Sequence, residues 1–369
     1  MHTLCGIVFS SAIVWEQLNC LNVIIMEPIL FVHPRNDFTG STRVLATVIA
    51  ADYSDAIVTV VTEDESGKGF LSGLDNVRII PYRRLRLRGR SIPKFTELWT
   101  WIQIFVLVLF YGKRHGMLYI NTIVPFAAAL AGRLRGMNIV YHIHEKFLNP
   151  DFVGRLMERV FYKTKAHHIY VSNYTRSAYG DVSGCSWEIK YNKLSKDFIA
   201  KAVPKPLVSR PRNTLLMISS LSTGKGIFNY VELARLMPDL CFRMVISADK
   251  GDIDQTFGDN LPQNIEIYPA QKDVTAFLYD TDLIINMSVP SLCVETFGMT
   301  VLEAMPFGVP AIVPNVGGPV ELVENGNNGY CLDVSDLDEM VYAVRSALVE
   351  DNYNRLSNNT LQRFKEKFR

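Results

Sequence analysis

Short apolar runs alternate with helix-like stretches along almost the whole chain, and this alternation restricts the fold more than any other feature. From residue 28 the first apolar run is PILFVHP, a helix-like stretch TRVLATVIAADY follows it, and AIVTVVTED and NVRIIPYRR come next. The pattern continues through HGMLYINTIV, FAAALAGRLRG, NIVYHIHE and AHHIYVS to about residue 195. Strands separated by helices in this way predict a parallel sheet.

The alternation stops between residues 196 and 213 and then begins again. The interruption, KDFIAKAVPKPLVSRPRN, carries three prolines and a single acidic residue, which is typical of an interdomain linker. Apolar runs resume with TLLMISSLS and continue through LCFRMVISAD, DLIINMS and PAIVPN. A chain of 369 residues also exceeds what one core usually organises. We therefore predict an α/β protein with two Rossmann-like, doubly wound domains facing a cleft, over residues 26–195 and 214–369. The last helix-like stretch, from about residue 337 to 369, could cross back over that cleft.

Charge and cysteine content limit the partners and cofactors. The formal net charge is only +1, so no global field attracts nucleic acid, and we expect no nucleic-acid partner. The six cysteines form no CxxC pair and no cysteine–histidine spacing that suits zinc. Asp252 and Asp254, in ADKGDID, have the spacing of a metal-binding DxD pair, but a solvated charged loop is the better interpretation. We expect reduced thiols, a cytoplasmic location, no metal and no cofactor.

The first 25 residues precede the predicted fold. Residues 4–14 and 98–111 are apolar, but both are shorter than a bilayer crossing requires. The first stretch lacks a basic n-region and an A-x-A-like cleavage site, which argues against a signal peptide. EPILFVHPRND, after Met26, has the pattern of a first strand and loop. We therefore interpret residues 1–25 as an N-terminal extension outside the fold.

An arginine-rich segment precedes the second apolar stretch. Residues 78–90, RIIPYRRLRLRGR, hold six arginines and no acidic residue, and an apolar stretch with Trp99, Trp101 and Phe105 follows. One interpretation is a surface for anionic lipid head groups or for a lipid-linked acceptor. The other is a solvated loop followed by an ordinary core helix. We favour the first, and predict peripheral contact with the inner face of a membrane through residues 78–105.

The segment after DLIINMS combines a loop, a helix start and two carboxylates. Glu295 falls in the predicted loop, Gly298 opens a predicted helix, and Glu303 follows about a turn and a half inside it. In a doubly wound domain, ligands bind at the carboxyl ends of strands, and anions favour the free amides of a following helix. Gly298 has no side chain to keep a phosphate away from those amides. If the phosphate belongs to a nucleotide, a carboxylate at Glu303 can accept hydrogen bonds from two vicinal ribose hydroxyls. Glu295 is then expected to face a sugar attached to that phosphate.

These two glutamates, with seven residues between them, FG after the first and AM after the second, resemble the signature of glycosyltransferase family four. FGVPAIVPNVGGPVELVENGNNGY resembles the rest of that family's donor domain. The resemblance implies a GT-B fold and a metal-independent enzyme that retains anomeric configuration. It also implies a nucleotide-diphosphate sugar as donor, with Glu295 orienting the sugar. The donor-binding residues predicted in this segment are Phe297, Gly298, Met299, Thr300 and Glu303.

Upstream, ISSLSTGKGI matches the place where the family carries a GRL-type turn followed by a Lys-Gly pair. Lys225 and Gly226 fit the pair, and the resemblance implies that Lys225 helps to stabilise the leaving diphosphate. The family's arginine falls on Ser220, so one of two expected positive charges is missing at this donor-binding position. A metal-independent enzyme needs cations to neutralise the leaving group, so another basic residue would have to substitute.

In the first domain, VHPRNDFTGSTRVL resembles the family's first loop. Gly40 fits the glycine that lets the chain approach the donor, and Ser41 fits the short polar residue that caps the following helix. The strand NIVYHIHE ends in two histidines, and the family places one near the transferred sugar. His142 aligns better than His144 and is our predicted catalytic histidine. A core histidine that only satisfies its own hydrogen bonds is the alternative.

The resemblance implies a retaining glycosyltransferase. Its predicted substrates are a nucleotide-diphosphate sugar and a glycan or lipid-linked acceptor, and the predicted role is in cell-surface polysaccharide biosynthesis. Two alternatives stay open. A GT-B epimerase or phosphorylase shares the architecture and differs in what enters the acceptor side. A non-catalytic nucleotide-sugar-binding module is compatible with the charge missing at Ser220.

Overall fold

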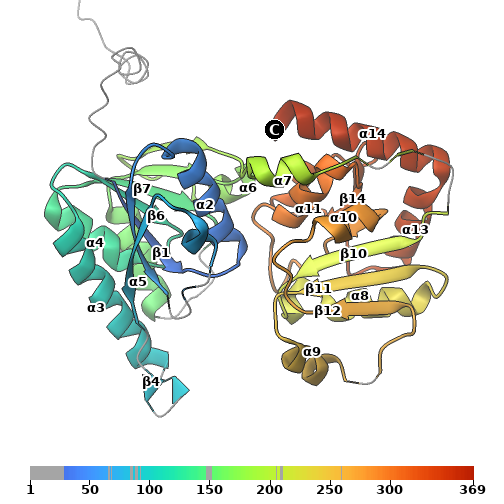
Figure 1. Ribbon diagram of the computed structural model, residues 1–369, viewed down its shortest axis with the longest axis horizontal. Coiled ribbons are helices and arrows are strands. Elements are labelled where there is room, and N and C mark those ends of the chain that lie inside the picture. The colour runs from blue at the N-terminus through green and yellow to red at the C-terminus, as the bar shows by residue number, and fades with distance from the viewer. Residues whose placement is uncertain are drawn as a thin grey trace, which may run out of the picture.

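The computed structural model of the chain describes residues 29–64, 67, 69–83, 86–87, 90–91, 93–146, 152–204, 206–207, 211–258 and 260–369; from 86 to 95 it describes the backbone only. The predicted extension at residues 1–25 lies outside the described residues, as does part of the arginine-rich segment. Two lobes stand side by side, each built on its own sheet (Figure 1).

The first sheet has seven parallel strands in the order β3-β2-β1-β6-β7-β8-β9. The strand order reverses between β1 and β6, which is the switch point where doubly wound sheets bind ligands. A short antiparallel hairpin, β4 with β5, projects from the lobe (Figure 1). The strands are β1 (Ile29–Arg35), β2 (Val58–Glu63), β3 (Val77–Tyr82), β4 (Arg86–Leu87), β5 (Arg90–Ser91), β6 (Met117–Asn121), β7 (Asn138–Ile143), β8 (His167–Tyr170) and β9 (Ser186–Ile189).

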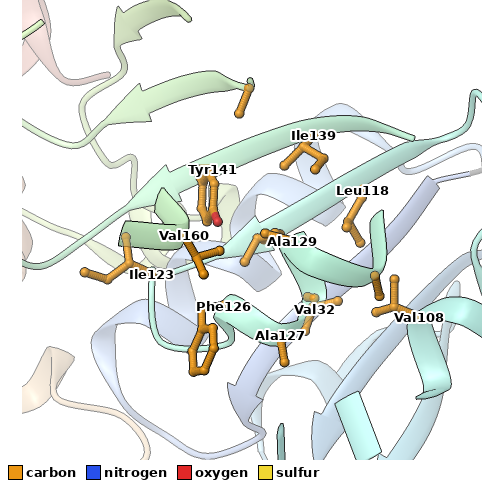
Figure 2. Close-up of a cluster of buried hydrophobic side chains, with 14 of the residues drawn as sticks. Val32, Val108, Leu118, Ile123, Phe126, Ala127, Ala129, Ile139, Tyr141 and Val160 are labelled. Carbon is orange, nitrogen blue, oxygen red and sulfur yellow. The ribbon is translucent and has the colours of Figure 1, made fainter. Parts of the chain in front are cut away.

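Helices cover both faces of this sheet. On one face, Val32, Leu118 and Tyr141 of the strands pack with side chains from α3, α4 and α5 (Figure 2). The buried face of α4 is made largely of alanines, such as Ala127 and Ala129, so the helix can lie close to the strands. On the other face, α2 packs over the sheet. The helices are α2 (Gly40–Asp52), η1 (Phe70–Gly73), α3 (Pro93–Tyr111), α4 (Phe126–Arg135), α5 (Phe152–Lys163), α6 (Asn173–Tyr179) and α7 (Lys196–Lys201).

The second sheet repeats the arrangement with six parallel strands in the order β12-β11-β10-β13-β14-β15. Its order reverses between β10 and β13. The strands are β10 (Thr214–Ser219), β11 (Cys241–Ile246), β12 (Ile265–Tyr268), β13 (Leu283–Ile285), β14 (Ala311–Pro314) and β15 (Gly329–Leu332). The helices are η2 (Thr223–Lys225), α8 (Ile227–Leu236), α9 (Lys250–Phe257), α10 (Thr275–Asp280), α11 (Met299–Ala304), η3 (Met305–Phe307), α12 (Pro319–Leu322), α13 (Leu337–Leu348) and α14 (Glu350–Lys367).

The predicted fold class is confirmed, because both sheets are parallel and doubly wound. Short strands with nearly continuous burial, such as Leu30–Val32, match the apolar runs of the sequence. None of the helices in the described part of the chain combines the length and hydropathy that a bilayer crossing requires.

The two lobes are joined by more than the chain connection. The carboxylate of Glu321, in α12, accepts hydrogen bonds from the backbone amides of Asn173 and Tyr174, each at 2.9 Å, at the start of α6. The same carboxylate accepts from the Tyr191 hydroxyl at 2.8 Å. Phe368, just after α14, packs with Tyr191 at 5.5 Å between ring centroids. The C-terminal helix therefore runs along the second lobe and its end contacts the first (Figure 1).

Candidate functional site

A cleft of about 480 Å³ lies between the lobes, at the carboxyl ends of the strands where both sheets reverse their order. The first lobe contributes the β1–α2 loop and the segment after β7. The second contributes the loops after β10 and β13 together with the start of α11. This is the place where open α/β sheets bind ligands.

Ten of the eleven side chains predicted for the site line this cleft. They come from three separate segments of the chain, which the sequence alone could not place beside one another. The ten are Gly40, Ser41, Ser220, Lys225, Glu295, Phe297, Gly298, Met299, Thr300 and Glu303. His142 is not among the lining residues. The predicted helix cap at Ser41 is also wrong, because Thr39 precedes the first helical residue and the Asp37 carboxylate accepts from its amide at 3.0 Å.

Lys225 and Glu295 form an ion pair on the second-lobe wall, with 2.6 Å between Nζ and Oε2. Burial opposes the charge of Lys225, but the Glu295 carboxylate outweighs it, so the lysine pKa is raised. The loop that carries Glu295 is supported by the two glycines after β14. A Cβ atom at Gly318 would lie 2.0 Å from the Thr296 carbonyl oxygen, and the Gly318 amide donates to the Glu295 carbonyl at 2.8 Å. Those glycines therefore permit a close backbone approach that fixes Glu295.

Glu303 and Arg43 form a second ion pair, which crosses the cleft. Glu303 is 3% exposed and lies in α11, which starts after Gly298 with its φ of 101°. Arg43 comes from the first turn of α2 and contacts the Glu303 carboxylate directly. Its guanidinium also lies over the Phe70 ring, 4.8 Å from the centroid. Burial lowers the pKa of Arg43, although Asp273 opposes this shift. The sequence prediction missed this arginine, although its position three residues after Gly40 was a usable signal.

The histidine of the cleft is His144 and not His142, which corrects the sequence prediction. His142 is 1% exposed within the sheet, its Nδ1 lies 2.8 Å from the Tyr119 hydroxyl, and its Nε2 has no hydrogen-bond partner among the described residues. Burial, and secondly the charge of Lys190, lower the pKa of His142 to about 3. Its ring packs 4.3 Å from the His144 ring, centroid to centroid. His142 thus supports the cleft histidine from below and stays neutral at physiological pH.

A chain of buried hydrogen bonds fixes the orientation of His144. The Thr42 hydroxyl donates to the Asp37 carboxylate at 2.7 Å and therefore accepts from Nε2 of His33 at 2.9 Å. His33 Nδ1 is then the acceptor for the Asn121 amide nitrogen, also at 2.9 Å. The Asn121 carbonyl oxygen accepts from Nε2 of His144 at 2.9 Å. In neutral His144, Nδ1 is therefore the unprotonated nitrogen, free to accept a hydrogen bond.

Glu145 also lines the cleft, next to His144, and was not among the predicted site residues. Burial raises its pKa to about 7, and the Ile123 amide, which donates to Oε1 at 2.7 Å, moderates the shift. A carboxyl group with this pKa is partly protonated near neutral pH. It can then donate as well as accept a hydrogen bond in the cleft.

In the part of the chain that the structure describes, no group of three or more histidine, cysteine, aspartate or glutamate side chains is arranged to hold a metal ion. Asp252 and Asp254 are exposed on α9 and do not line the cleft. The amide of Asp252 donates to the capping carboxylate of Asp249 at 2.9 Å. The two aspartates are therefore solvated, as expected, but they lie on a helix and not in the loop that the sequence predicted.

Comparison with protein families agrees with the position of the cleft. Residues 199–366 match the model of the family described as glycosyl transferases group 1. This range includes every second-lobe residue of the cleft. The match covers less than half of the chain, so it concerns the second lobe and not the first.

Relatives by sequence match a short segment only. Sucrose synthase 2 of Hordeum vulgare is 37% identical over 79 residues, which are 20% of this chain and 10% of that protein. The GDP-mannose-dependent alpha-mannosyltransferase of Corynebacterium glutamicum is 41% identical over 58 residues, which are 16% of this chain and 14% of that protein. The matched segments therefore span only about a tenth to a seventh of these relatives.

Similarity of structure extends over both lobes. The Anabaena protein HepE, solved with UDP and glucose, superposes with a TM-score of 0.73 and 20% sequence identity. The superposition covers 93% of this chain and 95% of that one. The chain thus has the GT-B fold, with both lobes and the cleft between them.

Proposed function

We propose that this chain is a retaining glycosyltransferase of family four, which transfers a hexose-type unit from a nucleotide-diphosphate sugar to a glycan or lipid-linked acceptor. One observation supports this most directly. The start of α2 in one lobe, with Gly40 and Ser41, and the Lys225–Glu295 and Gly298–Glu303 groups of the other surround a single cleft. The family match of residues 199–366 agrees with donor binding by the second lobe. The UDP and glucose in the HepE structure, and the mannosyltransferase name, support a hexose donor.

In the proposed complex, the donor's ribose hydroxyls donate to the Glu303 carboxylate, and Lys225 lies against the diphosphate. Glu295 and His144 orient the sugar, with the unprotonated Nδ1 of His144 accepting from a sugar hydroxyl. His144 takes the role predicted for His142, because it lines the cleft and His142 does not. No metal or cofactor is needed, since the cationic side chains of the cleft stabilise the negative charge of the leaving diphosphate.

The reaction forms one bond and breaks one bond at the anomeric carbon. An acceptor hydroxyl attacks that carbon from the face that the diphosphate occupies, while the bond from carbon to the phosphate oxygen breaks with its electron pair going to the diphosphate. The acceptor proton passes to that phosphate oxygen, so the products are a glycoside of the same configuration and a nucleoside diphosphate. The protein contributes position and charge, and no protein nucleophile takes part.

We also propose that the acceptor is reached at the inner face of a membrane, in cell-surface polysaccharide biosynthesis. Helix α3 supports this, because its outer face exposes five apolar side chains and no charged one between Leu98 and Tyr111. They are Leu98, Trp99, Ile102, Val106 and Phe110. The arginine-rich segment of residues 78–90 precedes this helix in the sequence, and basic residues combined with an apolar face favour binding to anionic lipid.

The purified chain tests the activity directly. A panel of nucleotide sugars is screened by thermal shift, and the donor that raises the melting temperature is incubated with lipid-linked saccharides. We expect release of the free nucleoside diphosphate and a product whose anomeric configuration, read by NMR, matches the donor. Glu303→Ala and Lys225→Ala are expected to reduce the thermal shift by more than half. Glu339→Ala and Lys250→Ala, which change exposed residues outside the cleft, serve as matched controls.

Each other outcome has a definite meaning. An isomerised donor without acceptor transfer would identify an epimerase, and binding without turnover for every acceptor would identify a binding module. A donor shift that survives in both Glu303→Ala and Lys225→Ala would show that the site is elsewhere.

A further inference from the structure

The charges that line the cleft are few and are already paired. Among its described lining residues, Arg43 and Lys225 are the two side chains with a permanent positive charge. Lys225 is held by Glu295 and Arg43 by Glu303, so each cation faces the cleft with a glutamate beside it. A donor diphosphate carries about two negative charges at neutral pH. One lysine does not neutralise it.

Arg43 stands on the wall opposite Lys225. It belongs to the first turn of α2, which begins with Gly40 and Ser41, whereas Lys225 ends η2 in the second lobe. The start of α2 lies close to the start of α11 in the second lobe. A Cβ atom at Gly40 would lie 3.9 Å from Cγ of Met299, the first residue of α11. The Arg43 guanidinium reaches across to α11, where it contacts Glu303.

The pair with Glu303 is one that a donor can exchange. On the proposed function, the ribose hydroxyls donate to the Glu303 carboxylate and compete with Arg43 for its oxygens. A guanidinium released in this way keeps its charge and its planar set of five N–H donors, which fits phosphate oxygens better than an ammonium does. Stacking on Phe70 keeps the plane oriented while its partner changes.

We propose that Arg43 is the second cation for the donor's diphosphate, and that it replaces the positive charge missing at Ser220. Ser220 is exposed and lines the cleft from the second lobe, and Arg43 lines the same cleft from the first. This assignment rests on the proposed function. Because Arg43 belongs to the first lobe and Lys225 to the second, a bound diphosphate contacts both lobes at once.

Calorimetric titration of wild type and variants tests the proposal. UDP, ADP and GDP are titrated first, and the base that binds is then compared as diphosphate, monophosphate and nucleoside. Arg43→Met is expected to lower the affinity for the diphosphate by at least about tenfold. Nucleoside affinity is expected to stay equal or to rise, because Glu303 loses its competing partner. Arg133→Met changes an exposed arginine of α4 outside the cleft and serves as the matched control.

A second variant separates lost charge from lost structure. In Arg43→Met/Ser220→Arg, the charge returns from the opposite wall, and we expect the affinity ratio of diphosphate to nucleoside to recover by about tenfold. An unchanged ratio in Arg43→Met would overturn the role of Arg43, and so would an equal loss for all three ligands. A double variant no better than Arg43→Met would overturn the replacement of Ser220. If the wild type bound none of the diphosphates, the proposed function itself would be wrong.

Discussion

His142 and His144 are two positions apart and point to the same side of the sheet, yet only the second reaches the cleft. His142 lies inside β7, where it pairs with Asn121 of β6 in the strand register, whereas His144 lies beyond the end of the strand. Sequence alignment at the level of motifs shifts easily by two residues in such a run. The end of β7 falls between them, so His142 is buried inside the sheet and His144 lies beyond it in the cleft.

The two histidines make a matched pair for mutation. We expect His144→Ala to lower kcat/KM at least about tenfold, because the residue that accepts from the sugar is lost. His142→Phe keeps an aromatic ring in the buried position and removes an Nε2 without a partner. It also removes the hydrogen bond with Tyr119, which does not line the cleft, so kcat/KM should stay within about threefold of wild type. Steady-state kinetics on both variants check this. Equal losses would mean that the cleft assignment of His144 is wrong.

The donor-binding residues of the second lobe could be predicted from the sequence because they lie close together along the chain. Glu295, Gly298 and Glu303 lie within nine residues, and their relation follows from one loop and one helix. Arg43 is 260 residues away from Glu303, and nothing local predicts that contact. The series of hydrogen bonds from Asp37 to His144 likewise links four segments that only the fold brings together.

At the scale of elements, helix α3 shows where periodicity stops being informative. A nearly continuous apolar run predicts a helix there, but it does not reveal which side is covered. In the structure, Ile104 and Val108 are buried against the sheet and Trp101 packs with Phe126 of α4. At 100° per residue, the five exposed apolar side chains occupy an arc of about 120° on the opposite side. The helix is therefore at once a core helix and an exposed apolar surface, so the two interpretations of residues 78–105 did not exclude each other.

If this surface meets anionic lipid, polar substitutions on it should release the protein. We expect wild type to sediment with vesicles that contain anionic lipid, and Ile102→Asn/Phe110→Asn to bind them at least about tenfold more weakly. Phe110 is 77% exposed and Tyr342 of α13 is 76% exposed, so Tyr342→Asn is a control of equal exposure outside α3. Vesicle binding that the double variant retains would argue against a membrane role for α3.

At the scale of the whole molecule, the architecture was predictable because the same pattern occurs twice. Each set of alternating runs specifies a parallel sheet, and a parallel sheet places its ligand side at the carboxyl ends of the strands. The pattern does not predict how the ligand-binding edges of the two sheets are oriented relative to each other. That depends on contacts such as Glu321 with the start of α6, which no repeat or motif announces.

The cleft between the lobes also makes stability depend on pH through Glu145. Its pKa is about 7 in the folded protein, above the ordinary 4.5, so the folded state binds the proton more tightly than the unfolded state does. The stability that this provides is complete below about pH 4.5 and is lost as the pH rises through 7. At about 1.4 kcal/mol for each pH unit, wild type should lose up to about 3 kcal/mol relative to Glu145→Gln over that range. Urea denaturation of both proteins between pH 5 and 8 measures this difference; a difference that does not vary with pH would mean that the carboxyl group titrates normally. Glutamine can still accept from the Ile123 amide, so the comparison isolates the charge.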